Sequence, residues 1–552
     1  MKFFKKYYFI IIIILIAAFF RLYRLDSVPP STSLDEVTYG YNAYSILKTG
    51  RDEYGNFMPI LLRAYDDWRP ALYVYLVAPL VQVLGLEVLA VRLPSAVLST
   101  IAVFFVYLLT KELFDLKKYS FKINDFSFDI SHATAILLAI SPWNVYISRL
   151  GHEVNLGFSF FIFALYFFFT SIKHQDRRYW LILSAAFFAL SFYTYQSFKI
   201  ITPIFFIILT LFYLKELFKN KLPVLFSLVV FIILTIPILK ASLAPEALIR
   251  FNGTSAFADN PLYSITDAKW LSARIRGDKW NTFLNDPKIT AARIIAGNYL
   301  SHFNWNWITR GGATENFKIP GLGLIYIWEV PLIILGFIYL IKSDIDKRIK
   351  LLIFVWLFSA PIPASVSTQA PHAMRTMTAL PALQFLSALG LFWLSFLLRN
   401  YKKLILGIWL ILILINVVYL YHQYFRVFPV AQSEAYQYGL NQALPYVVSI
   451  VSHYRTVIVS NERNLSQSYM FYLYWSKFDP VTYLRQGGTK SGGFAEFHVI
   501  GKYNFRPIHW HSEHPEKGML YVGNTDDFPA GSPFLKIFKS LDGTAAVQVS
   551  GF

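Results

Sequence analysis

The chain has 552 residues, of which 55% are hydrophobic and 15% charged, whereas soluble globular proteins carry about 25% charged residues. This composition excludes an ordinary soluble enzyme and indicates a polytopic α-helical membrane protein. The net charge of +18 is better explained by basic loops on one side of a membrane than by nucleic-acid binding. With 0 cysteines there is no disulfide, thiolate metal site or cysteine nucleophile.

The N-terminal segment places Lys2, Lys5 and Lys6 before an apolar run with no small-residue cleavage site after it. We interpret it as an uncleaved first span whose N-terminus is cytoplasmic. Ten further runs can span a membrane if their flanking aromatics are included. The eleven runs are 7–20, 92–110, 132–148, 156–172, 179–195, 200–214, 222–239, 321–341, 350–362, 377–397 and 403–421.

The apolar run 71–86 decides the topology, because every later loop changes sides if it crosses. If it lies in the outer interface or re-enters, six segments face the cytoplasm, and each carries three or four Lys or Arg residues. They are 2–6, 111–130, 173–178, 215–221, 342–350 and 399–403. The short outer turns at 149–155 and 196–199 then carry only Arg149 and Lys199. This strong positive-inside pattern predicts about 11 spans and a C-terminus outside.

The outer side is expected to hold most of the non-membrane chain. The membrane domain, 1–421, has outer loops at 21–91, 149–155, 240–320 and 363–376. The tail, 422–552, is predicted to be a small extracytoplasmic α/β domain. Its expected strands are 457–460, 494–500, 518–522 and 545–549, and its expected helix is 466–478. A glycine-rich phosphate loop is absent, so no nucleotide cofactor is expected.

Two adjacent acids, Asp35 and Glu36, open the first outer loop after Ser33. On a helix they point about 100° apart, so we expect different roles: one faces a substrate and the other binds a neighbouring Arg or a metal. The alternative is a solvated first helical turn, where Ser33 caps the helix and acids favour its N-terminus.

Further polar residues gather on the same predicted face. They are Asp67, Arg69, Arg92, His152, Glu153, His372 and Arg375. Each also has a plain interpretation, since an Arg at a helix end can reach lipid headgroups and a polar turn can sit at headgroup level. Together they provide acids to activate a hydroxyl and cations to bind a phosphate. This combination suggests a reaction between a lipid-phosphate donor and a hydroxyl acceptor.

Five short motifs resemble the GT-C glycosyltransferases of the protein O-mannosyltransferase and aminoarabinose-transferase group. They are Leu34-Asp35-Glu36-Val37, Arg69-Pro70-Ala71-Leu72, Val91-Arg92-Leu93-Pro94, Ser148-Arg149-Leu150-Gly151-His152-Glu153, and Pro371-His372-Ala373-Met374-Arg375 followed by Pro381. Ala71 replaces the second proline of that group's basic-Pro-Pro element.

The resemblance implies an inverting hexosyl- or pentosyltransferase in the plasma membrane. Its donor is a polyprenyl-phosphate sugar, and its acceptor is a hydroxyl of a protein, lipid or glycan at the outer face. We assign Asp35 and Glu36 to catalysis, with Asp35 as the general base. Arg92, His372 and Arg375 would bind the donor phosphate. His152, Glu153, Asp67 and Arg69 would orient the acceptor or a metal, with Glu36 and Glu153 as ligands of a divalent cation. Nucleic acid is not an expected partner.

Two alternatives stay open from the sequence. A transporter or a lipid-linked-glycan flippase would place ionisable groups in the middle of spans, whereas here they lie at span ends. A GT-C polymerase or ligase that joins glycans would carry the same motifs, because the acceptor pocket is built from variable outer loops.

Overall fold

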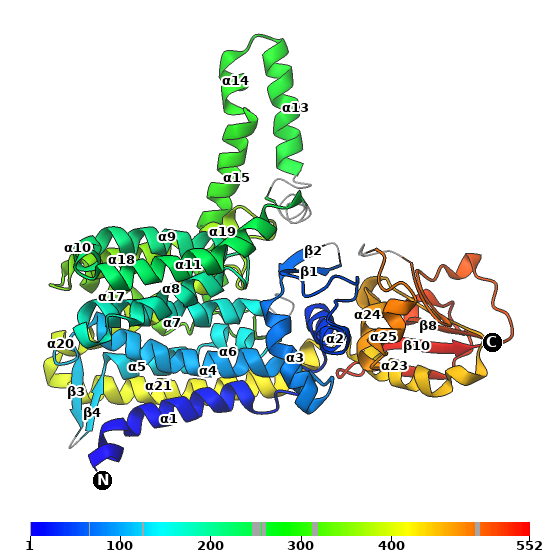
Figure 1. Ribbon diagram of the computed structural model, residues 1–552, viewed down its shortest axis with the longest axis horizontal. Helices are drawn as coiled ribbons and strands as arrows, with labels where there is room; N and C mark the ends of the chain where they lie inside the picture. Colours follow the sequence, from blue (N-terminus) through cyan, green and yellow to red (C-terminus); the bar gives the residue numbers. More distant parts are fainter. Residues whose placement is uncertain are drawn as a thin grey trace.

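The computed structural model describes residues 2–65, 67–123, 126–245, 255–256, 261–311, 318–491 and 497–552. A bundle of roughly parallel helices forms the body, with the N-terminus at one end and a separate sheet domain beyond the other (Figure 1). The chain is therefore a helical membrane-type protein with a small C-terminal α/β domain, as the sequence predicts.

Every predicted apolar run contains a helix. The bundle helices are α1 Lys2–Leu22, α4 Val88–Leu113, α5 Ile130–Ala139, α6 Pro142–Ser148, α7 Glu153–Lys173, α8 Trp180–Ser191, α9 Phe198–Phe212, α11 Lys221–Ser242, α17 Glu329–Lys342, α18 Lys347–Ser359, α20 Ala382–Leu397 and α21 Lys402–His422. Helices α5 and α6 share one run and bend by 54°. The bend follows from Pro142, which has no backbone N–H to continue α5 and instead opens α6 behind the Ser141 cap.

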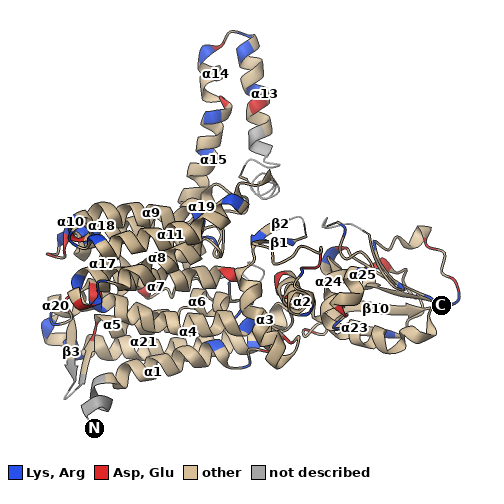
Figure 2. Cartoon of the chain, in the orientation of Figure 1, with Lys and Arg blue, Asp and Glu red and all other residues tan. Residues whose placement is uncertain are grey.

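Six helical stretches in the described part of the chain are long and apolar enough to cross a membrane, or seven if α5 and α6 count as one span. Four shorter apolar helices accompany them, and α1, α8 and α9 are among these four. Charged residues gather at the two ends of the bundle and are almost absent from its middle (Figure 2). The number of crossings and the side of each terminus stay predictions.

The ambiguous run 71–86 forms α3, Leu72–Leu84. With 13 residues it is about 20 Å long, well short of the roughly 30 Å hydrocarbon core. It follows the hairpin of β1 (Leu61–Ala64) and β2 (Asp67–Pro70). It lies at the bundle end next to the C-terminal domain, across the direction of α1 and α4 (Figure 1). This is the geometry that an interfacial helix requires.

Several smaller elements surround the bundle. A hairpin of α13 Pro261–Ile275, α14 Lys279–Leu284 and α15 Pro287–Ser301 projects sideways from it (Figure 1). Trp280 near the hairpin tip is largely exposed. The remaining elements are β3 Ser120–Ile123, β4 Phe126–Asp129, α10 Leu214–Lys219, α16 Trp305–Thr309, α19 Ile362–Ser365 and α22 Phe428–Ala431.

The C-terminal domain is a six-stranded mixed sheet in the order β6-β7-β5-β8-β10-β9. Its elements are α23 Tyr438–Ile450, β5 Thr456–Val459, α24 Ser468–Trp475, α25 Pro480–Arg485, β6 His498–Ile500, β7 Tyr503–Phe505, β8 Met519–Asn524, β9 Lys536–Lys539 and β10 Ala545–Gly551. The predicted strands correspond to β5, β6, β8 and β10, although 494–496 lies outside the described residues. Strands β7 and β9 and helix α23 were not predicted.

The C-terminal domain packs on α2 (Leu34–Thr49) through α24 and α25. Glu53, buried beside α2, links the two. Its carboxylate accepts hydrogen bonds from Asn42 (3.0 Å) on α2 and from Thr489 (2.7 Å) and Tyr469 (3.4 Å) in the domain. The domain therefore braces the helix that carries Asp35 and Glu36.

This brace should be pH-dependent. Burial raises the pKa of Glu53 to about 7, and the nearby Asp52 carboxylate adds to the rise. The hydrogen bonds from Asn42 and Thr489 act in the opposite direction but are outweighed. The folded state therefore keeps a proton that the unfolded chain has lost, and this stability disappears as pH rises through about 7. We expect Tm to fall between pH 5 and pH 8, by an amount equivalent to about 3 kcal/mol for this group. Glu53→Gln should flatten that slope, whereas Glu516→Gln, at a largely exposed position, should leave it unchanged. An unchanged slope in Glu53→Gln would contradict the assignment.

Candidate functional site

The first turn of α2 fixes the two acids in divergent directions. Ser33 caps the helix by accepting the Glu36 N–H (3.3 Å), and the Ser33 N–H donates to Glu36 Oε2 (2.8 Å). This capping box closes the turn without using Asp35. Asp35 and Glu36 therefore face different neighbours, as the spacing predicts.

Glu36 is buried and binds Arg92. Arg92 Nε donates to Oε1 (2.7 Å) and Nη2 to Oε2 (3.1 Å), while the Gly151 N–H also donates to Oε1 (2.9 Å). With the Ser33 N–H, the carboxylate accepts four hydrogen bonds and is 1% exposed. The structure thus gives Glu36 the Arg-binding role of the predicted pair. Both carboxylate oxygens of Glu36 are occupied by these hydrogen bonds, so neither is open for the predicted catalytic contact.

Arg92 is fully buried and its remaining N–H groups hold the first outer loop. They donate to the carbonyls of Leu25 (3.1 Å), Pro29 (2.9 Å) and Ser31 (2.5 Å). The sequence predicts that Arg92 binds the donor phosphate, but a guanidinium saturated by Glu36 and three carbonyls cannot also reach a ligand. Arg92 therefore acts as a structural tie between α4 and the loop before α2.

Asp35 has a different environment. Arg69 Nη1 is paired with its Oδ1, and His152 Nε2 lies 3.5 Å from its Oδ2. The side chain is 29% exposed, against 1% for both Glu36 and Glu153. Burial acts to raise the pKa of Asp35, but Arg69 and His152 outweigh it and hold this pKa well below its usual range. Asp35 is therefore a reachable carboxylate that stays ionised.

Arg69 connects Asp35 to the other predicted acids. Its Nε donates to Asp67 (2.6 Å), and its Nη1 lies 3.4 Å from the Tyr39 hydroxyl. That hydroxyl donates to Glu153, which is buried at the start of α7. Tyr39 was not predicted, although it lies four residues after Asp35 on the same helix face. The structure therefore brings Asp35, Asp67, Arg69 and Glu153 into one hydrogen-bonded cluster.

His152 joins this cluster through both ring nitrogens. Its Nδ1 accepts the Val154 N–H (3.2 Å) and so caps α7. Its Nε2 faces Asp35. His152 can hold the Asp35 carboxylate in place by donating to it, while Glu153 lies 3.2 Å from Nδ1.

Gly151 permits the close approach of this turn to α2 and α4. A Cβ there would lie 2.7 Å from Val91 Cγ1 and 3.1 Å from Glu36 Cγ. Gly151→Ala should therefore destabilise the protein by about 1–3 kcal/mol and lower activity, because the Glu36–Arg92 pair must shift. Gly407→Ala is the matched control, since no atom lies within 4 Å of a Cβ at that position. Equal melting temperatures for the two variants would contradict this packing.

The second half of the site is the turn between α19 and α20. His372 is mostly buried, and its backbone N–H donates to His302 Nε2 (3.2 Å). The backbone N–H of Arg375 donates to His372 Nδ1 (3.4 Å). Burial lowers the pKa of His372 to about 3, and the positive charge of Arg375 is the second cause. His372 is therefore neutral near pH 7 and cannot supply the positive charge that the sequence suggests. His302 was not predicted as a site residue.

Arg375 provides the cation of this turn. Its Nη1 donates to Ser367 Oγ (2.7 Å) and to the Thr368 carbonyl (2.6 Å), which fixes the side chain. Arg375 is only partly buried. A fixed, partly exposed guanidinium is suited to binding a phosphate.

The turn after α8 links the two halves. The Ser197 hydroxyl donates to the Arg375 carbonyl (3.1 Å), and the Tyr195 ring lies 5.5 Å from the His152 ring. The acidic cluster and the Arg375 turn therefore lie on either side of Tyr195–Ser197. They form one candidate site at one end of the bundle.

An apolar cavity of about 340 Å³ lies beside the Arg375 turn. Its lining includes His302 and Thr376 from the turn region, together with aromatic and aliphatic side chains of α16, α17 and α20. Trp143, also in the lining, donates to the Ala373 carbonyl (2.9 Å). Its apolar lining is suited to a hydrocarbon chain.

The predicted metal ligands do not fit a cation. Glu36 is engaged by Arg92 and backbone N–H groups, and Glu153 accepts the Tyr39 hydroxyl. Among the described residues, no three His, Asp or Glu side chains are grouped as metal ligands. The predicted divalent-cation requirement can be tested by chelation.

Comparison with known proteins gives one family match over part of the chain and a similarity of fold to solved structures. Residues 68–240 match the family model of dolichyl-phosphate-mannose-protein mannosyltransferase. The crystal structure of ArnT from Cupriavidus metallidurans bound to undecaprenyl phosphate superposes with a TM-score of 0.54 and 12% identity, covering 98% of each chain. No curated protein matches the chain.

A second structure is more distant. The Archaeoglobus fulgidus oligosaccharyltransferase tethered to an acceptor peptide with an NVT sequon matches with a TM-score of 0.49 and 15% identity, over 86% of this chain and 64% of that one. The family match and the ArnT fold confirm the predicted resemblance to GT-C glycosyltransferases.

Proposed function

We propose that this chain, which has the fold of the GT-C glycosyltransferases, moves a hexose or pentose from a polyprenyl-phosphate carrier to an acceptor hydroxyl with inversion. The observation that carries the proposal is the pairing of a reachable, ionised Asp35 with a fixed Arg375 turn at one end of the bundle. The acids and the cation lie at helix ends, which favours transfer chemistry over a transport pathway through the bundle.

Asp35 is the group we assign to the acceptor. The acceptor hydroxyl attacks the anomeric carbon and passes its proton to Asp35 as the new C–O bond forms. The bond between the anomeric carbon and the phosphate oxygen breaks, and its electron pair leaves with the lipid phosphate. Arg69 and His152 lower the basicity of Asp35, so proton transfer occurs late, when the attacking oxygen has already become acidic.

Arg375 is the group we assign to the donor phosphate. Negative charge grows on this phosphate as the sugar leaves, and a guanidinium held by Ser367 and Thr368 stabilises it without reorganisation. The neutral His372 can contribute only an N–H donor. The cavity lined by Trp143 and Ile333 would take the isoprenoid chain. The undecaprenyl phosphate bound by ArnT supports a carrier of this class.

Arg375→Ala should raise the KM for the donor by about 10- to 100-fold, because a charge-assisted hydrogen bond contributes about 1.5–3 kcal/mol. The KM for the acceptor should change little. Initial rates at varied donor and fixed acceptor concentration measure this. Arg310→Ala is a control from the same outer region. A donor KM equal to that of the wild type would assign Arg375 to headgroup anchoring.

The stereochemistry of the product tests the proposed chemistry. NMR of the glycosylated acceptor should show the anomeric configuration opposite to that of the donor, since a single displacement inverts the carbon. Retention would require a covalent glycosyl-enzyme and would contradict the role of Asp35 as a base. Peptide, lipid and glycan acceptors, tested in parallel, identify the acceptor class. Assays with and without EDTA test the metal requirement.

A further inference from the structure

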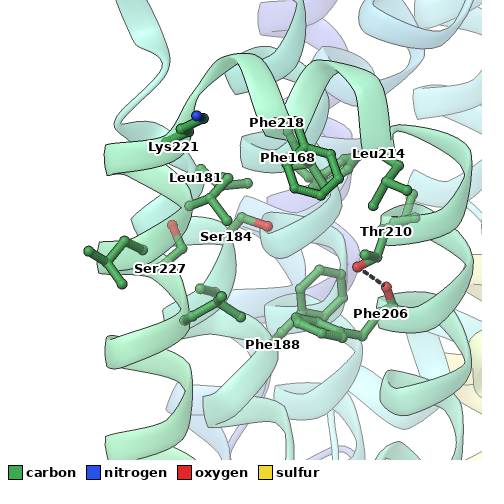
Figure 3. A pocket seen from close by; sticks show the side chains of 16 residues that line it. Phe168, Leu181, Ser184, Phe188, Phe206, Thr210, Leu214, Phe218, Lys221 and Ser227 are labelled. Carbon is green, nitrogen blue, oxygen red and sulfur yellow. Dashed lines mark hydrogen bonds between the residues drawn. The ribbon is translucent and has the colours of Figure 1, made fainter.

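A second apolar cavity lies at the other end of the bundle. It measures about 490 Å³, within the usual range of small-ligand pockets, and lies between α8, α9, α10 and α11, with Phe168 of α7 also in its lining (Figure 3). Phe168 is fifteen residues after Glu153 on the same helix, which places the cavity about 22 Å from the acidic cluster along α7. The proposed transfer reaction does not use it.

The lining is suited to a hydrocarbon chain. Most of its side chains are Leu, Phe, Val or Ala. Its three hydroxyl groups are already satisfied within the protein: Ser184 donates to the Ala164 carbonyl, Thr210 to that of Phe206, and Ser227 to that of Pro223. A ligand that enters therefore meets no polar group that requires a partner, and an aliphatic chain fits without a desolvation penalty.

The cavity has a basic rim. Lys221, an exposed residue, lies at the edge of the lining, and Lys215 and Lys219 are close to it in the chain (Figure 3). Glu216 is the one acid in the segment 214–221, and it is paired with Arg348 at 2.7 Å. Lys221 therefore places a positive charge at the edge of the apolar groove. Leu225 and Leu228, at the start of α11, are exposed at the same place.

We propose that this cavity binds an acyl chain of an anionic glycerophospholipid, with the lipid phosphate at Lys221. The positive-inside prediction puts this end in the cytoplasmic leaflet, whose anionic lipids are attracted to basic residues beside a span. A hydrocarbon chain in the groove and a phosphate at its rim match the two halves of such a lipid. The site is independent of the proposed transferase function.

Native mass spectrometry of the full chain tests the site. Protein purified in detergent would be equilibrated with equal amounts of phosphatidylglycerol and phosphatidylcholine, and the retained lipid counted. We expect one phosphatidylglycerol to be retained about fivefold in preference to phosphatidylcholine. Lys221→Gln should abolish the preference. Lys215→Gln is the matched control, because it removes the same charge from the same segment but not from the lining.

A second variant blocks the groove itself. Leu228→Trp fills the mouth from a partly exposed position, so the fold should survive, as the melting temperature would verify. It should remove retention of both lipids. The proposal is overturned if Lys221→Gln and Leu228→Trp retain phosphatidylglycerol like the wild type, or if Lys215→Gln loses the preference equally. It is also overturned if polyprenyl phosphate displaces the phospholipid, or if a second copy of the chain occupies the groove.

Discussion

Asp35→Asn is expected to lower the rate of sugar transfer by about 10²- to 10⁴-fold, the usual contribution of a general base. Asparagine keeps the size of the side chain and can still accept a hydrogen bond from Arg69 or His152, but it cannot take a proton. The melting temperature should fall only modestly, because Arg69 keeps Asp67 as an ion-pair partner. Release of lipid phosphate from a labelled donor measures the rate. Asp526→Asn, at a largely exposed position in the C-terminal domain, is the control for loss of an acid.

The pH profile adds a second readout for Asp35. Because Arg69 and His152 hold its pKa well below the usual range of an aspartate, Asp35 stays ionised throughout pH 5–8. Its titration should not reduce the rate as the pH falls to 5. Turnover of Asp35→Asn at the wild-type rate would remove Asp35 from the base role. A rate that falls with a pKa near 6 and loses that fall in Asp35→Asn would contradict its environment.

Arg92→Met should destabilise the fold by about 3–5 kcal/mol, because it leaves the buried Glu36 carboxylate without its counter-ion. It also leaves the carbonyls of Pro29 and Ser31 without donors. Thermal unfolding of the purified protein measures this loss. The double variant Glu36→Gln with Arg92→Met should recover part of the stability, since the buried charge is then absent.

Arg92→Met also separates the structural role from the predicted phosphate contact. Arg455→Met, at a largely exposed position, controls for the loss of an arginine. A wild-type melting temperature together with a raised donor KM would support the predicted contact between Arg92 and the donor phosphate. A large loss of stability supports the buried tie between α4 and the first outer loop.

Much of the fold could be predicted because its signals are local. Each apolar run forms a helix, whereas the interfacial placement of α3 follows from the distribution of basic residues among the loops and stays a prediction. The bend before Pro142 could also have been read from the proline itself. Strands β7 (Tyr-Asn-Phe) and β9 (Lys-Ile-Phe-Lys) were missed because polar residues interrupt them, whereas β5 lies in a continuous apolar run.

The site was only partly predictable, because burial depends on tertiary contacts. The 100° divergence of Asp35 and Glu36 and the position of Tyr39 one turn later follow from helix geometry. Helix geometry does not predict whether Arg92 faces lipid or the loop at 25–31, since its neighbours Val91 and Leu93 are both apolar. The pairing of His302 with His372 joins positions 70 residues apart, and no local pattern connects them.

Donor turnover tests the central claim most directly. Purified wild-type protein in lipid nanodiscs would be incubated with a panel of polyprenyl-phosphate sugars and with peptide, lipid and glycan acceptors, and free polyprenyl phosphate quantified. We predict acceptor-dependent release from at least one donor, lost in Asp35→Asn. Failure of every donor to yield polyprenyl phosphate, while sugar nucleotides are consumed, would contradict a lipid-phosphate glycosyltransferase.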